Sequence, residues 1–207
     1  MKGKEKNFAR TLPEGYGEVF HIDARNKKVG IILNLIAVGI ATAVVALAFI
    51  PVAVWGLPAA EIGFWEVELA ILGWVIGMLA YMVLHELTHG VAYKALTGEK
   101  LTFGMSWSCA FCGVPNVYTY RRTALVALVA PLCVFSVLLL GLMAVAFFVH
   151  PLFYWMATAL FAMHLGGCCG DGYMTWLLLF KHTNPALLMR DTGPEQWLYL
   201  PESPEHI

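Results

Sequence analysis

The chain has 207 residues, of which 59% are apolar and 13% are charged, with a formal net charge of −1 and five cysteines. An average soluble domain carries about 25% charged residues, so this composition indicates a membrane protein with a few spans in a single domain, residues 1–207. The balanced charge and few cysteines exclude a nucleic-acid partner and a disulfide-stabilised scaffold.

Four transmembrane helices are predicted, which makes the expected fold an all-α integral membrane protein. Residues 29–60, 69–85 and 123–170 contain no Asp, Glu, Lys or Arg. A spanning helix needs about 20 apolar residues, so the last region is long enough for two helices, and Pro151 marks the break. The predicted spans are 31–55, 69–96, 123–149 and 152–180.

The basic residues predict the orientation of these spans. All 13 Lys and Arg residues lie before the first span, from the cytoplasmic end of the second span to the start of the third, or after the fourth. The positive-inside rule therefore places segment 1–28, the link between spans two and three, and tail 181–207 in the cytoplasm. The expected location is a multi-pass position in the lipid bilayer of a cell membrane.

Two cytoplasmic segments have strand-like patterns. Residues 101–120 alternate in polarity around a Gly-Val-Pro-Asn break, which predicts a short β-hairpin between helices two and three. Residues 19–22 also resemble a strand and are expected to join the same surface sheet. An open edge of that sheet could accept an extended peptide as an added strand.

The predicted second span contains the segment His85-Glu86-Leu87-Thr88-His89, an H-E-x-x-H pattern. On a helix, His85 and His89 share one face and can bind a single zinc ion. Glu86 follows the first ligand and can hold a water molecule as general base instead of binding the metal. A carboxylate inside a span is costly, so a functional reason for Glu86 is expected.

A catalytic zinc ion needs a third protein ligand, and Asp171 is the only other acid within the predicted spans. His85 is nine residues from Lys94 and Asp171 is ten from Lys181, so both lie at similar depth. Asp171 could instead be a buried acid bonded to His164 or to backbone in the glycine-rich segment 166–172. His164 could be a metal ligand, a residue hydrogen-bonded to a metal ligand, an oxyanion donor or a core histidine. Cys168 could approach the metal.

Cys109 and Cys112 have the spacing of half a zinc knuckle or of a redox pair. No second cysteine pair lies near them on the cytoplasmic side, so a structural role is favoured.

These motifs resemble those of a bacterial family of membrane zincin peptidases known as a domain of unknown function and, more distantly, of site-2 proteases. The resemblance includes residues 12–16, 22–23 and 26–28, the motif at 85–90, Ala130-Pro131 and Gly170-Asp171-Gly172. In site-2 proteases an Asp-Gly pair on a later span supplies the third zinc ligand, which implies this role for Asp171. The Asn and Pro that usually precede that Asp are missing, and His164 is a possible stand-in for the Asn.

The expected function is a zinc-dependent endopeptidase that cleaves membrane-associated proteins or peptides within the membrane or at its surface, with one Zn²⁺ per chain. The alternatives are a non-catalytic zinc-binding protein and a metal transporter or sensor. A transporter needs polar groups across the membrane, and the first and third spans offer only Asn34, Thr42, Thr123, Cys133 and Ser136.

Overall fold

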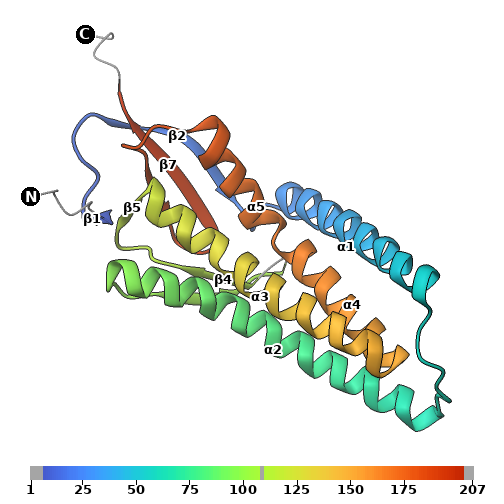
Figure 1. Cartoon of the computed structure of the whole chain (residues 1–207). Coiled ribbons are helices and arrows are strands. Elements are labelled where there is room, and N and C mark those ends of the chain that lie inside the picture. Colours follow the sequence, from blue (N-terminus) through green and yellow to red (C-terminus); the bar gives the residue numbers. More distant parts are fainter. Residues whose placement is uncertain (1–6, 108–109, 203–207) are drawn as a thin grey trace, which may run out of the picture. The chain divides into compact units, whose positions relative to one another are not determined.

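The computed structural model describes residues 7–107 and 110–202. In this part of the chain the long helices are α1 (Lys27–Trp55), α2 (Phe64–Thr97) and α3 (Arg121–Val149) (Figure 1). They are followed by α4 (Pro151–Gly167), α5 (Cys169–Trp176) and a π-helical turn at Leu177–Lys181.

The helices correspond closely to the predicted spans. Among the described residues, α1, α2 and α3 are each long and apolar enough to cross a membrane, and α4 with the helix after it makes a fourth candidate. This fourth candidate is bent by 41° at its break. Gly166 and Gly167 immediately precede the break, where glycine weakens a helix because it loses more backbone freedom on folding than other residues.

The predicted all-α class is wrong in one respect, because the described chain also contains a five-stranded antiparallel sheet. Its strand order is β1-β5-β6-β7-β2. The strands are β1 (Phe8–Ala9), β2 (Tyr16–Asp23), β5 (Tyr118–Tyr120), β6 (Leu188–Asp191) and β7 (Glu195–Pro201).

The sheet was missed because two of its three interior strands, β6 and β7, lie in residues 181–207, which the sequence analysis interprets only as a cytoplasmic tail. Leu188, Met189 and Leu198 are fully buried there, and burial of such side chains against α3 and α5 stabilises the sheet. The turn between β6 and β7 contains Gly193 at φ +102°, a conformation that glycine adopts without strain.

A separate two-stranded hairpin lies between the second and third helices and pairs β3 (Thr102–Met105) with β4 (Ala110–Gly113). The expected turn is wrong, because both strands end by Gly113, the first residue of the Gly-Val-Pro-Asn break, and the strand after the break, β5, belongs to the five-stranded sheet. The expected strand at 19–22 is part of β2, but β2 pairs with β7 in the five-stranded sheet and not with this hairpin.

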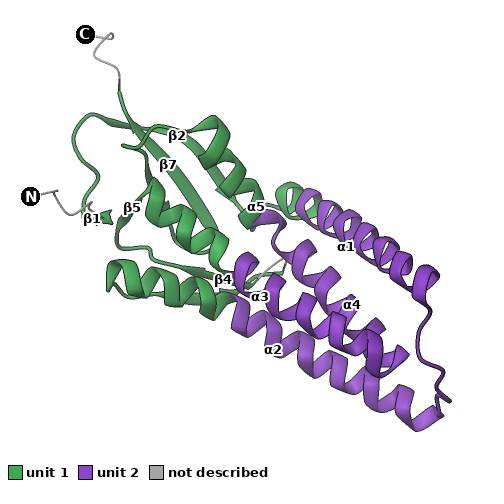
Figure 2. Cartoon of the chain, in the orientation of Figure 1, with its two compact units in different colours: residues 1–31, 86–130, 171–207 green, residues 32–85, 131–170 purple. Residues whose placement is uncertain are grey.

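The chain forms two compact units (Figure 2). The first comprises residues 1–31, 86–130 and 171–207 and contains both sheets, and the second comprises residues 32–85 and 131–170. In the second unit, α1 and α4 come close at Gly166, where an added Cβ would lie 2.7 Å from the carbonyl oxygen of Ala37. Tyr154 also donates a hydrogen bond to the carbonyl of Ala48 at 2.6 Å.

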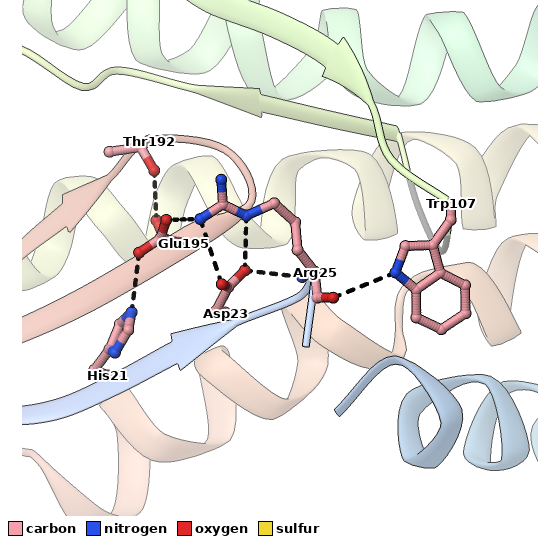
Figure 3. Close-up of polar contacts among 6 residues, drawn as sticks. All are labelled: His21, Asp23, Arg25, Trp107, Thr192 and Glu195. Carbon is pink, nitrogen blue, oxygen red and sulfur yellow. Dashed lines mark hydrogen bonds and ion pairs between the residues drawn. The ribbon is translucent and has the colours of Figure 1, made fainter. Parts of the chain in front are cut away.

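A polar network in the first unit surrounds the point where β2 leads into α1 (Figure 3). The guanidinium of Arg25 pairs with the carboxylates of Asp23 and Glu195, and Glu195 also contacts His21. Trp107 donates its indole N–H to the carbonyl of Arg25 at 3.3 Å. These groups are partly exposed, so each ion pair contributes about 1 kcal/mol or less.

Candidate metal centre

Four side chains spaced four residues apart line one face of α2: Tyr81, His85, His89 and Tyr93. The segment around them is rich in Leu, Met and Ala, which favour a helix and carry its apolar surface. Both histidines are buried, with 7% of His85 and 6% of His89 exposed. A buried imidazole needs partners for its ring nitrogens, and the structure provides them from α2 itself and from α3 and α5.

His89 is held on both sides of its ring. Its Nδ1 lies 2.8 Å from the carbonyl oxygen of Ala127 on α3, and its Nε2 lies 3.3 Å from Oδ2 of Asp171 on α5. The carbonyl of Ala127 can take this role because residue 131, whose N–H would normally bond to it within the helix, is a proline. Pro131 therefore leaves an acceptor for the histidine.

The contacts of His89 fit a metal ligand. A carbonyl can only accept, so Nδ1 carries a proton and a neutral ring then presents a lone pair at Nε2. That lone pair faces a carboxylate oxygen, and two acceptors at 3.3 Å require a cation or a proton between them. Imidazole and carboxylate are ligands that Zn²⁺ prefers, and a metal-binding histidine usually donates its other N–H to a carbonyl or carboxylate.

His85 has its partner within α2. Its Nδ1 lies 2.9 Å from the hydroxyl of Tyr81, one turn earlier in the helix. The same hydroxyl lies 2.8 Å from Nδ1 of His164, whose Nε2 is 3.0 Å from the hydroxyl of Ser136. His164 is fully buried.

Among the described residues, two groups of three side chains have ligand atoms within 4.8 Å of one another. They are His85, His89 and Asp171, and His85, His164 and Cys168. Both groups are buried or half-buried and either could hold a metal ion. In the second group, however, the Tyr81 hydroxyl already bonds to Nδ1 of both histidines, so an ion bound by those two atoms would have to displace it.

Glu86 lies on α2 next to His85 and is half-buried. The pKa of the Cys112 thiol is raised to about 12, mainly by burial and also by the negative charges of Glu86 and Asp191. Cys112 is therefore a neutral thiol in the fold, which favours the structural interpretation of this residue. Cys109 lies outside the described residues.

Asp191, at the end of β6, was not recognised in the sequence as part of this region. It is 2% exposed and accepts hydrogen bonds from the Tyr93 hydroxyl, the backbone N–H of Gly193 and the amide of Gln196. Burial is the main reason that the pKa of Asp191 is raised to about 6. It connects the sheet to the face of α2 that carries His89.

The structure thus places the sequence candidates in two neighbourhoods. His89 and Asp171 are in contact, whereas His164 and Cys168 lie together, with Cys168 Sγ 3.6 Å from His164 Nδ1. Tyr81 was missed, although its spacing of four residues from His85 was a usable signal.

The comparison with known families places the chain in one of them. A family profile described as "Putative zincin peptidase" matches residues 78–185, which include both candidate groups. The chain belongs to this family. No curated protein matches the chain, and no solved structure does. The resemblance noted from the sequence motifs is therefore confirmed for the zincin peptidase family, whereas the likeness to site-2 proteases stays a prediction.

Proposed function

We propose that this zincin-family protein is a zinc metallopeptidase that hydrolyses peptide bonds of membrane-associated proteins, with one Zn²⁺ held by His85, His89 and Asp171. The observation that carries the proposal is the pair of contacts around His89. Its Nδ1 is 2.8 Å from the carbonyl of Ala127, while its Nε2 faces the Asp171 carboxylate at 3.3 Å. This arrangement has the donor set and the outer partner of a zinc site.

The side chains around the ion have separate roles in this proposal. A zinc ion bound there would supply a Lewis acid toward water and toward the scissile carbonyl. The carboxylate of Glu86, adjacent to His85, accepts a proton from the attacking water and returns it to the leaving nitrogen. Asp171 brings a negative charge to the ion, and Ala127 fixes the ring orientation of His89.

A membrane position of the site is supported by the apolar residues that the helices expose. Leu35 on α1, Val137 on α3 and Phe148 on α3 are exposed by 68%, 73% and 77%. Leaving so much apolar surface in water is unfavourable, and lipid removes that cost. The proposed substrates are therefore membrane proteins or peptides that reach the site from the bilayer or its surface.

Glu86→Gln tests the peptidase proposal. The amide cannot accept the proton, so cleavage should fall at least 100-fold while zinc content stays near one ion per chain. Zinc is measured by elemental analysis of the purified full chain, and cleavage by mass spectrometry on synthetic single-span peptides reconstituted with it.

Glu68→Gln is the matched control, because Glu68 is an exposed acid on the same helix. It should leave both zinc and cleavage unchanged. If Glu86→Gln keeps full cleavage, the general-base role is wrong. If the unaltered chain binds zinc but cleaves none of the peptides, a non-catalytic zinc protein or a metal transporter becomes the better interpretation.

A further inference from the structure

The hydroxyl of Tyr81 lies between two buried imidazoles. It is 2.9 Å from Nδ1 of His85 and 2.8 Å from Nδ1 of His164. On the far side of the His164 ring, Nε2 is 3.0 Å from the hydroxyl of Ser136. All four residues belong to the same compact unit, and His164 is fully buried.

The number of protons determines how these groups can bond. A tyrosine hydroxyl has one proton, so it donates to only one of the two histidines and accepts from the other. If Nε2 of His85 binds the metal, its Nδ1 carries the proton and donates to Tyr81. Tyr81 then donates to His164 Nδ1, which places the proton of a neutral His164 on Nε2, where Ser136 accepts it.

We propose that Tyr81 is a positioning residue for the metal site, and that His164 and Ser136 fix the direction in which its hydroxyl donates. The chain of three hydrogen bonds keeps the proton of His85 on Nδ1 and so directs the Nε2 lone pair toward the ion. This inference rests on the proposed role of His85 as a zinc ligand, and it assigns His164 to orientation of a ligand instead of metal binding.

The contact of Cys168 with His164 is compatible with the same direction of donation. The Sγ of Cys168 lies 3.6 Å from His164 Nδ1, and a neutral thiol is a weak donor. With Nδ1 as the acceptor of the Tyr81 proton, the Cys168 thiol can donate to the same nitrogen. A histidine that served only to fill space could be replaced by an apolar residue without loss of zinc.

Tyr81→Phe is the first test, because it removes the hydroxyl and keeps the ring. Loss of an outer partner of a metal-binding histidine should weaken the apparent zinc affinity about 10- to 100-fold. The affinity is measured by competition with a chromogenic chelator on the detergent-purified full chain, alongside the thermal unfolding midpoint.

Tyr154→Phe is the matched control. Tyr154 is another buried tyrosine of the same unit, 1% exposed, and its hydroxyl donates to the carbonyl of Ala48. This variant should lower the unfolding midpoint to a similar extent and leave zinc affinity unchanged. Equal zinc affinities for Tyr81→Phe and Tyr154→Phe would overturn the inference.

His164→Leu gives a sharper test, because a purely structural role would not produce the same pattern. Without His164 as acceptor, the Tyr81 hydroxyl can rotate and donate to His85 Nδ1. The proton of His85 then lies on Nε2, where it opposes metal binding. Zinc affinity should fall about 10- to 100-fold. The double variant Tyr81→Phe with His164→Leu should bind zinc no more weakly than either single variant, whereas fully additive losses would contradict the inference.

Two reference variants separate this inference from the proposed function. If His85→Ala keeps its zinc, the proposed metal site itself is wrong. If His85→Ala loses zinc but Tyr81→Phe behaves like Tyr154→Phe, the proposed function stands and the positioning role fails. If Cys168→Ala loses zinc and Asp171→Ala keeps it, the ion lies in the other group and displaces Tyr81, which also overturns the inference.

Discussion

At the scale of single residues, the most informative contacts are those on the two sides of the His89 ring. A backbone carbonyl holds Nδ1, and a carboxylate faces Nε2. In the proposed zinc site the two nitrogens therefore have different roles, as they have in metal-binding histidines generally. The role proposed for Asp171 can therefore be tested separately from that of Glu86.

Asp171→Ala should weaken zinc binding at least about 10-fold, because it removes the carboxylate that faces His89. The measurement is chelator competition on the purified chain. Asp23→Ala, which removes a carboxylate on β2 bonded to Arg25, is the control and should bind zinc normally. Normal zinc binding by Asp171→Ala would point to Cys168 or His164 as the third ligand.

Asp191 should make the stability depend on pH. Its pKa is raised from the ordinary value of 3.8 to about 6, mainly by burial. Between about pH 4 and pH 6 the folded state therefore binds more protons than the unfolded state, and the free energy of unfolding falls as the pH rises. Below this window the carboxyl is protonated in both states, and above it the loss is constant at about 3 kcal/mol or less.

Unfolding midpoints of the wild type and of Asp191→Asn, measured in detergent from pH 4 to pH 7, test this expectation. The difference between the two proteins isolates this group from the other titrating residues. The variant should show a smaller decrease between pH 4 and pH 6. Parallel curves would mean that Asp191 does not titrate in this range.

The sequence was sufficient to find His85, Glu86, His89 and Asp171 as candidates, because ionisable groups inside apolar spans are costly and therefore conspicuous. It was not sufficient for their partners. Tyr81 and Ser136 are ordinary residues in a span, and the carbonyl of Ala127 has no side-chain signal at all. Asp191 lies in a polar segment, where one more acid attracts no notice.

At the scale of elements, α3 contributes to the candidate site through a missing hydrogen bond. Pro131 has no N–H for the carbonyl of Ala127, and that carbonyl lies 2.8 Å from His89 Nδ1. Pro131 thus makes a backbone acceptor available to His89. It was noted in the sequence only as part of a family resemblance, without a physical reason.

Pro131→Ala should weaken zinc binding about 10-fold, because the new N–H competes with His89 for the carbonyl of Ala127. The helix itself should not become less stable, since alanine is a better helix former than proline. Zinc affinity and the unfolding midpoint are measured together. Pro51→Ala, which removes a proline inside α1, is the control and should not affect zinc.

The helices were predictable from the sequence because apolar length alone identifies them. The five-stranded sheet was not, because β1, β5 and β6 are only two to four residues long and the pairings β1–β5, β5–β6 and β2–β7 join strands far apart in the chain. Such pairing depends on contacts that no local pattern contains. Alternation in β7 and the Thr192-Gly193-Pro194 turn were the available signals.

At the scale of the whole molecule, the sheet limits the possible membrane topology. Its strands come from three segments: before α1, between α2 and α3, and after α5. Hydrogen-bonded strands must lie on one side of a membrane, so helices that cross a membrane between these segments would have to cross it in pairs. This supports the proposed topology of four crossings, with α4 and α5 together forming the fourth.

Cysteine labelling of sealed membrane vesicles tests this topology. In a chain without its native cysteines, Lys100→Cys and Glu202→Cys should react with a membrane-impermeant maleimide from one side. Glu61→Cys, in the exposed connection between α1 and α2, should react only from the other side. Labelling of Lys100→Cys and Glu202→Cys from opposite sides would contradict both the topology and the sheet.

The strand order also has a consequence for biosynthesis. Strands β6 and β7 occupy central positions in the sheet, yet they follow every other strand in the chain. While the ribosome is still producing the last helix, β2 has no neighbour and β5 can pair only with the two-residue β1. The sheet is therefore completed only after the last helix has been synthesised, and the hydrogen bond between Asp191 and Tyr93 of α2 is among the last contacts that can form.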